Sequence, residues 1–93
     1  MERLIKNMNR WIYALLDGEQ TFEEEKVINF FAGGKAYCFK FNLVVEKFRD
    51  WTVTLYEVNY GMETYIDGLK CNAGHKQHVH LLTELLLRRH CKN

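Results

Sequence analysis

The sequence predicts an α+β domain in which an N-terminal and a C-terminal helix pack on one face of an antiparallel sheet of three to four strands. Two amphipathic helical patterns lie near the ends of the 93-residue chain, and alternating apolar residues lie between them. A helix with one apolar stripe must bury it against another layer, and so must a sheet with one apolar face. We therefore expect residues 1–93 to form a single domain.

The first helical pattern lies at the start of the chain. Its apolar residues recur at spacings of three, four and seven, which places them on one side of a helix. Gly18 follows as a C-terminal stop. This pattern predicts a helix over roughly residues 3–17, with an apolar stripe made of Leu4, Ile5, Met8, Trp11, Ile12, Leu15 and Leu16.

The segment 22–32 fits two kinds of element. Thr21 and Glu24 have the spacing of a capping box, which favours a short helix. The β-branched and aromatic residues that follow favour a strand that turns at Gly33. We expect a strand over about 25–31, with the helix as the alternative.

From Ala36 the apolar period becomes two, which is typical of an antiparallel strand with one buried face. Arg49-Asp50 suits a turn into a second strand of the same kind. Gly61 then leads into a shorter strand from Met62 to Ile66, which we expect Asp67-Gly68 to end. The predicted buried face of the two long strands consists of Tyr37, Phe39, Phe41, Leu43, Val45, Trp51, Val53 and Leu55.

A leucine-rich segment near the end of the chain predicts the second helix. Glu84 and Arg88 are spaced as an i,i+4 ion pair on its polar side. His90 and Cys91 follow at a terminus that we expect to fray. The predicted apolar stripe of this helix consists of Leu81, Leu82, Leu85 and Leu86.

Helix, three-stranded sheet and helix is also the order of elements in double-stranded-RNA-binding domains. Gly74-His75-Lys76, before the last helix, resembles the basic turn of that family. The chain has no proline for the family's Gly-Pro-x-His loop, and His75-Lys-Gln-His78 replaces its lysine cluster. The resemblance covers only the order of elements, and we do not assign the chain to that family.

Composition narrows the classes of function. The formal net charge is +1, from 13 basic and 12 acidic residues, which argues against general attraction to nucleic acid or membranes. No stretch approaches the 18 apolar residues of a membrane-spanning helix. Three cysteines are too few for the disulfide framework of a small secreted domain. These features predict a cytoplasmic protein with no membrane partner.

All four histidines and two of the three cysteines lie after residue 70. Cys71, His75 and His78 could bind zinc from a glycine-containing loop, because thiolate and imidazole are its usual ligands. No CxxC or HxxxH pair supports them. We expect a polar loop leading into the last helix and no metal, with zinc at these three residues as the alternative.

The sequence contains no recognisable catalytic motif. Cys38 and Cys71 would each need a histidine placed beside them by the fold in order to act as nucleophiles. Neither a Gly-x-Ser-x-Gly elbow nor a phosphate-binding or dinucleotide-binding glycine loop is present. We therefore expect that the protein is not an enzyme.

The second face of the sheet is the best candidate for binding. Aromatic side chains beside a lysine are typical of surfaces that stack nucleic-acid bases, and also of the contact cores of protein interfaces. An acidic edge near residue 24 could engage a basic protein surface. The candidate partner-binding residues are Lys40, Tyr56, Tyr60, Tyr65, Glu23, Glu24 and Glu25.

These observations together predict a small binding protein that acts through protein–protein contacts. We expect a regulator or inhibitor of another protein, of the kind common among phage and mobile-element proteins. A nucleic-acid-binding module using the tyrosine-rich face is the alternative. Homodimerisation is a further hypothesis, because a short chain with an aromatic second face gains stability by pairing.

Overall fold

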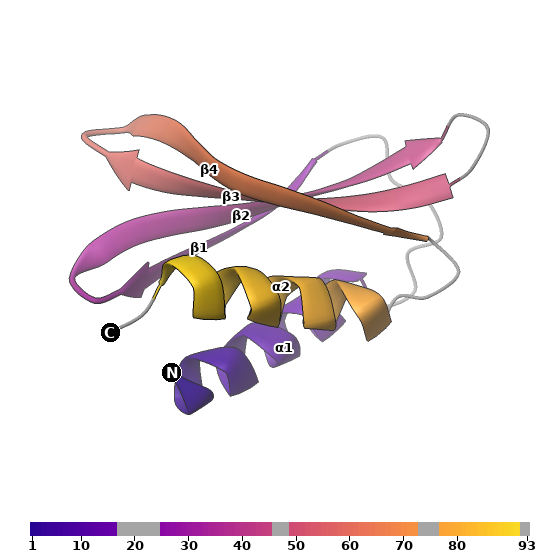
Figure 1. Cartoon of the computed structure of the whole chain (residues 1–93), viewed down its shortest axis with the longest axis horizontal. Helices are drawn as coiled ribbons and strands as arrows, with labels where there is room; N and C mark the ends of the chain where they lie inside the picture. The colour runs from indigo at the N-terminus through magenta and orange to yellow at the C-terminus, as the bar shows by residue number, and fades with distance from the viewer. Residues whose placement is uncertain (17–24, 46–48, 73–76, 92–93) are drawn as a thin grey trace.

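The computed structural model describes residues 1–16, 25–45, 49–72 and 77–91. The strands form one antiparallel sheet in the order β1-β2-β3-β4, and both helices lie on the same face of it (Figure 1). This is the α+β architecture that the sequence predicts. The elements in chain order are α1 (Glu2–Leu16), β1 (Lys26–Ala32), β2 (Lys35–Val45), β3 (Arg49–Asn59), β4 (Met62–Asn72) and α2 (Gln77–His90).

The hydrophobic core lies between the helices and the sheet face that they cover, which we call the inner face. Phe39 is at its centre, because the strand register places it between Ile28 and Leu55. Its ring lies 5.1 Å from that of Phe30 and 6.1 Å from that of Phe41. The helices contribute buried side chains at Met8, Ile12, Val79, Leu86 and Leu87.

The predicted buried face of the long strands is confirmed where side chains are described. Tyr37, Phe39, Phe41, Trp51, Val53 and Leu55 are all buried, whereas the side chains of Leu43 and Val45 lie outside the described part. The ambiguous segment 22–32 is a strand over its residues 26–32; residues 22–24 lie outside the described ranges. Alternate residues of β1 point into the core, which is the strand period of two.

Both described hairpins turn through two residues. Gly33 and Gly34 have φ angles of 57° and 78°, and Tyr60 and Gly61 have φ angles of 51° and 77°. Positive φ at both central positions is the type I′ turn, whose twist matches that of the flanking strands. Glycine adopts this conformation without strain, whereas Tyr60 does not.

The prediction that the last strand ends at Asp67-Gly68 is wrong, because β4 continues to Asn72. Ile66 is an extra residue in β4, since Leu55 pairs with Asp67 while Tyr56 pairs with Tyr65. Such a bulge lets a strand pass through residues of low strand propensity while its pairing continues on either side.

Three further boundaries differ from the predictions. Arg49 and Asp50 pair with β2 at the start of β3 and do not form the expected turn. Cys71 pairs with Trp51 inside β4 and is not part of a loop. The C-terminus is packed as far as Cys91, whose N–H donates to the carbonyl of Leu87 at 2.9 Å, so the expected fraying is wrong there.

The buried stripe of α2 is rotated from the predicted one. Val79, Thr83, Leu86 and Leu87 are fully buried, whereas Leu81 and Leu85 are exposed. The Thr83 hydroxyl donates to the Val79 carbonyl at 2.6 Å, which satisfies a polar group inside the core. No helix in the described part of the chain is long and apolar enough to cross a membrane.

Candidate functional site

The predicted tyrosine-rich surface lies on the sheet face opposite the two helices. We call it the outer face, and the strand register determines its members. None of the described helices covers it (Figure 1). Its two central cross-strand rows, from β1 to β4, are Asn29, Cys38, Tyr56 and Tyr65, and Val27, Lys40, Thr54 and Gly68.

Lys40 organises the middle of the outer face. Its ammonium group pairs with Glu25 at 3.6 Å and, more closely, with Glu63. The ammonium also lies 4.8 Å from the centre of the Tyr56 ring, within cation–π range. The hydrogen bond to Glu63 is the main cause that raises the pKa of Lys40. Asn42 donates to Glu25 at 3.0 Å, which helps to hold that carboxylate in place.

Tyr65 completes this cluster from β4. Its ring meets the Tyr56 ring edge-on, with centres 6.1 Å apart and planes at 81°, which is a favourable aromatic geometry. Its hydroxyl lies above Gly68, where a Cβ atom would stand 3.3 Å away. A side chain at residue 68 would therefore displace Tyr65 or be strained against it.

The remaining predicted partner-binding residues lie apart from this cluster or outside the described ranges. Tyr60 is fully exposed at the β3–β4 turn, at one end of the sheet. Glu23 and Glu24 lie outside the described residues. The structure thus brings together four of the seven candidates, namely Lys40, Tyr56, Tyr65 and Glu25.

Sequence reasoning missed three exposed apolar residues at the sheet edges. Phe31 is 79% exposed, Met62 74% and Val27 42%. Val27 and Phe31 alternate with the buried Ile28 and Phe30, so β1 is apolar on both faces. A strand that is apolar on both faces shows no alternation of apolar and polar residues. The sequence of β1 therefore could not indicate which of its two faces is exposed to solvent.

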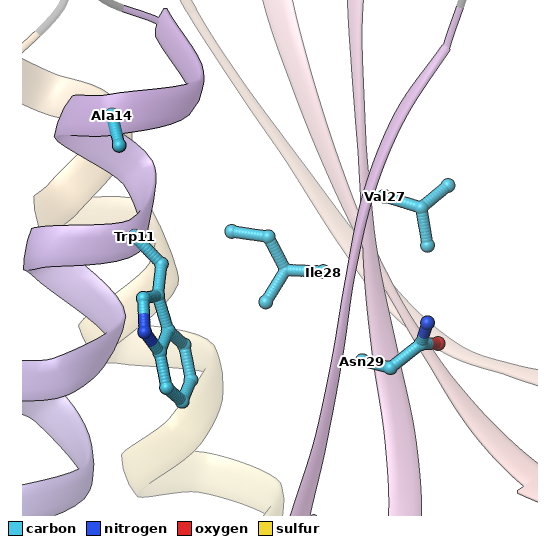
Figure 2. Close-up of a pocket in the computed structure, with 5 residues that line it drawn as sticks. All are labelled: Trp11, Ala14, Val27, Ile28 and Asn29. Carbon is cyan, nitrogen blue, oxygen red and sulfur yellow. The ribbon is translucent and has the colours of Figure 1, made fainter.

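A shallow pocket lies where α1 passes beside β1. Its volume is about 420 Å³, and Figure 2 shows Trp11 and Ile28 in the space between the helix and the strand. Val27 and Asn29 point to the other side of β1. Trp11 is 41% exposed, although the sequence pattern assigned it to the buried stripe of α1.

The cysteine and histidine candidates whose positions are described lie in different elements. Cys71 lies in β4, His78 lies in the first turn of α2, and His75 is outside the described residues. Within the described ranges, no three His, Cys, Asp or Glu residues are close enough to hold a metal ion. The zinc alternative, which needs His75, therefore stays a prediction.

Two of the three thiols are buried. Cys38 is 1% exposed despite its place on the outer face, and burial raises its pKa. Burial raises the pKa of Cys91 to about 11, and its thiol contacts the Tyr37 hydroxyl. Both thiols are therefore neutral near pH 7, which is the state of structural cysteines and not of nucleophiles.

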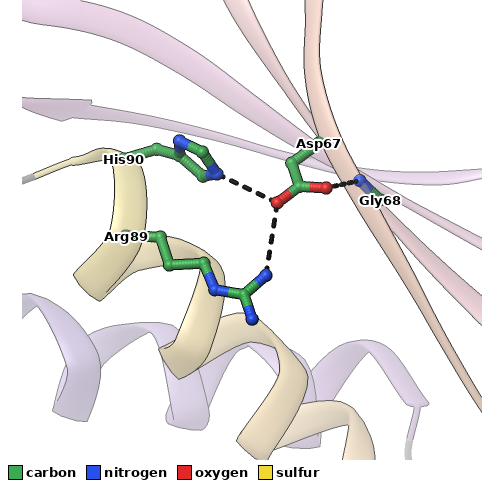
Figure 3. Close-up of polar contacts among 4 residues, drawn as sticks. All are labelled: Asp67, Gly68, Arg89 and His90. Carbon is green, nitrogen blue, oxygen red and sulfur yellow. Dashed lines mark hydrogen bonds and ion pairs between the residues drawn. The ribbon is translucent and has the colours of Figure 1, made fainter.

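The last histidine belongs to a polar contact between α2 and β4. Asp67 Oδ2 lies 3.0 Å from His90 Nε2 and 3.5 Å from Arg89, while its other oxygen accepts the N–H of Gly68 (Figure 3). The His90 hydrogen bond is the main cause that lowers the pKa of Asp67. This contact explains how an aspartate is accommodated on the inner face, and it is structural.

Two contacts join the helices to each other. Arg88 pairs with Glu84, as the sequence spacing predicts, and also with Glu2 of α1 at 2.8 Å. The His80 ring contacts the Tyr13 ring, with centres 4.4 Å apart and planes tilted by 35°, and burial lowers the pKa of His80. Both contacts connect α2 to α1 and help to hold the helix layer together.

The resemblance to double-stranded-RNA-binding domains does not extend to the strand count, because this sheet has four strands in its described part. Comparisons of the chain with protein-family models, curated proteins and solved structures give no significant match. A function for this chain must therefore be inferred from the arrangement of its surface residues.

Proposed function

We propose that the protein is a small regulator or inhibitor that binds another protein through its outer face. The observation that supports this is the cluster of Tyr56, Tyr65 and Lys40 on a sheet face that no described helix covers. Tyrosines supply large contact area with few rotatable bonds, and these two are already held by their neighbours. A surface ordered before binding loses less entropy when a partner docks.

Charge favours a protein partner over a nucleic acid. A base-stacking face needs cations that are available for phosphates. Here Lys40 is neutralised by Glu25 and Glu63, and the whole chain carries a net charge of only +1. Around Lys40 the outer face therefore offers aromatic rings beside a cation that is already paired with carboxylates, which disfavours a phosphate backbone as the partner.

The state of the cysteines supports a cytoplasmic setting for this function. Cys38, Cys71 and Cys91 form no disulfide bond in the structure. Free cysteines persist in reducing compartments, whereas small secreted domains usually pair theirs. An origin among phage or mobile-element proteins stays a hypothesis that the identity of the partner would test.

The proposal is tested by placing a photo-reactive benzoyl-phenylalanine at Tyr65 and irradiating cells that express the chain. The matched control carries the same group at Leu81 in α2, because the two positions are 61% and 60% exposed. We expect a discrete protein adduct from residue 65 and none from residue 81. A second variant, Lys40→Glu, should reduce the adduct because it places three carboxylates together beside Tyr56.

Three results would contradict the proposal. One is the same adduct from both positions, which would indicate unspecific contact with abundant proteins. Another is no protein adduct from residue 65 in the organism that encodes the chain. The third is an adduct from residue 65 that nuclease removes, which would favour the nucleic-acid alternative.

A further inference from the structure

The two edges of the sheet are built differently. β4 contains the bulge at Ile66 and carries Glu63, Asp67 and Lys70, and bulges and charges are the devices that keep edge strands from pairing. β1 pairs with β2 in unbroken register and has no charged residue between Val27 and Ala32. No described strand pairs with its other side. Only the β1 edge is therefore suited to accept another strand.

The sequence of β1 is complementary to itself when two copies run antiparallel. With Asn29 opposite Asn29 of a second copy, Val27 lies opposite Phe31 and Ile28 lies opposite Phe30. Apolar residues then face apolar residues on both sides of the sheet. Lys26 lies opposite Ala32, so no like charges meet.

Neighbouring registers lack this match. With Ile28 opposite itself, Lys26 would lie opposite Phe30 and Val27 opposite Asn29. With Phe30 opposite itself, Asn29 would lie opposite Phe31. Each shift places a polar or charged side chain against an apolar one, so the register centred on Asn29 is the one selected.

The backbone is oriented for the same register. Alternate residues of an antiparallel strand direct their N–H and C=O groups to the same neighbour. Ala32 and Lys35 close the β1–β2 turn, so the backbone groups of Ala32 point toward β2. Because the direction alternates along the strand, the N–H and C=O groups of Val27, Asn29 and Phe31 point away from β2. In the proposed register these three residues are opposite one another, so their groups can exchange hydrogen bonds.

The pocket beside β1 extends the contact into the helix layer. A two-fold axis through Asn29, perpendicular to the sheet, places α1 of both copies next to each other above the joined strands. Trp11 and Ala14 line this side of α1 and would be covered there. A stable interface usually needs about 800 Å² from each partner, which a strand of seven residues reaches only with such a second layer.

We propose that the chain forms a symmetric homodimer by antiparallel pairing of β1 with β1 of a second copy, centred on Asn29. The sheet then runs continuously through both copies, and their outer faces adjoin. The homodimer expected from the sequence used the aromatic second face, whereas this one leaves that face free. It does not depend on the function proposed above.

Sedimentation equilibrium of the full chain from about 1 to 100 µM tests the dimer. We expect a dimer for the unmodified chain and a monomer for Phe31→Lys, because the lysine would face Val27 of the second copy. The matched control is Met62→Lys on the opposite edge of the sheet, because the Met62 side chain is 74% exposed and the Phe31 side chain 79%. It should stay dimeric.

A cysteine at Asn29 tests the register. Asn29 would lie opposite itself, with Cα atoms about 5.5 Å apart, which a disulfide can bridge. Because Asn29 also lies opposite Cys38 of its own chain, the variant is made in a Cys38→Ala background. Asn29→Cys should then form a disulfide between residues 29 of two copies under mild oxidation, mapped by mass spectrometry. Val27→Cys, which faces Phe31, should not pair with itself.

Either of two results overturns the dimer. One is a monomeric unmodified chain across the whole concentration range. The other is a dimer that Phe31→Lys leaves intact, or that Met62→Lys disrupts equally. Circular dichroism establishes whether each variant is folded. If Phe31→Lys is unfolded, the presence or absence of the Asn29→Cys disulfide decides whether the proposed dimer forms. Because no partner protein is present, failure here leaves the outer-face proposal untouched.

Discussion

Individual polar residues are the places where this small core is most sensitive to solution conditions. His80 is half-buried between the helices, and its Nδ1 has no hydrogen-bond partner among the described residues. Burial penalises the charged imidazolium and therefore lowers the pKa of His80 below 6.5. Asp67 is the opposite case, because His90 and Arg89 stabilise its charged form.

The lowered pKa of His80 predicts a loss of stability on acidification. Below pH 6.5 the unfolded chain binds a proton at this residue more readily than the folded chain, so the free energy of unfolding falls as pH falls. His80→Phe keeps a ring against Tyr13 and cannot titrate. Thermal melts at about pH 7.5 and 5.5 should show a smaller decrease for His80→Phe than for the unmodified chain.

Tyr13→Phe is the control for this prediction. It preserves the ring contact and the histidine, so it should retain the pH dependence of the unmodified chain. Equal pH dependence in His80→Phe and Tyr13→Phe would mean that His80 does not control this transition.

At the scale of elements, the two hairpins show how turn geometry and side-chain choice can conflict. The β1–β2 turn uses two glycines at positive φ, whereas the β3–β4 turn places Tyr60 at a φ of 51°. A left-handed conformation costs a residue with a Cβ roughly 1–2 kcal/mol. Tyr60 gains nothing from burial in return, since its side chain is fully exposed. The strain is thus a reason to expect a role in binding at this tip.

Tyr60→Asn should stabilise the fold by about 1 kcal/mol, because asparagine tolerates the first position of a type I′ turn. Urea unfolding measures the change. Gly61→Ala is the matched control: its φ is 77°, and no atom lies within 4 Å of an added Cβ. It should destabilise by about 1 kcal/mol through the backbone alone. A destabilised Tyr60→Asn variant would contradict the assignment of strain.

At the scale of the whole molecule, the sheet separates two very different environments. The inner face and the helices enclose the aromatic core around Phe39, which is completely buried. The outer face and the β1 edge expose apolar side chains that contribute little to the folded monomer. A domain of this size has a total unfolding free energy of about 5–14 kcal/mol, so the inner face must supply nearly all of it.

Phe39→Ala should therefore cost about 3–5 kcal/mol, because it leaves a cavity beside Phe30 and Phe41. Phe31→Ala removes the same atoms from a side chain that is 79% exposed. Its cost should stay within about 0.5 kcal/mol at protein concentrations too low for a dimer. Chemical denaturation of both variants measures the contrast, and similar costs at the two positions would contradict the assignment of the faces.

Local periodicity was sufficient to predict the class and order of the elements. The alternation around Phe39 and Val53 identified the inner face, and the stripe through Met8 identified α1, because both patterns repeat within a few residues. The same alternation located Lys40 and Tyr56 on the outer face. Such features need no knowledge of distant contacts.

Contacts between residues far apart in the chain decided the rest. β4 passes through Asp67 because Arg89 and His90 of α2 meet that carboxylate. The buried side of α2 depends on which of its leucines contact the sheet. The positive charge of Lys40 is offset by two glutamates that come from other segments of the chain. Such contacts join residues that are far apart in the chain, so no local periodicity in a single sequence indicates which residues will be in contact. Only the folded arrangement of the elements determines these distances.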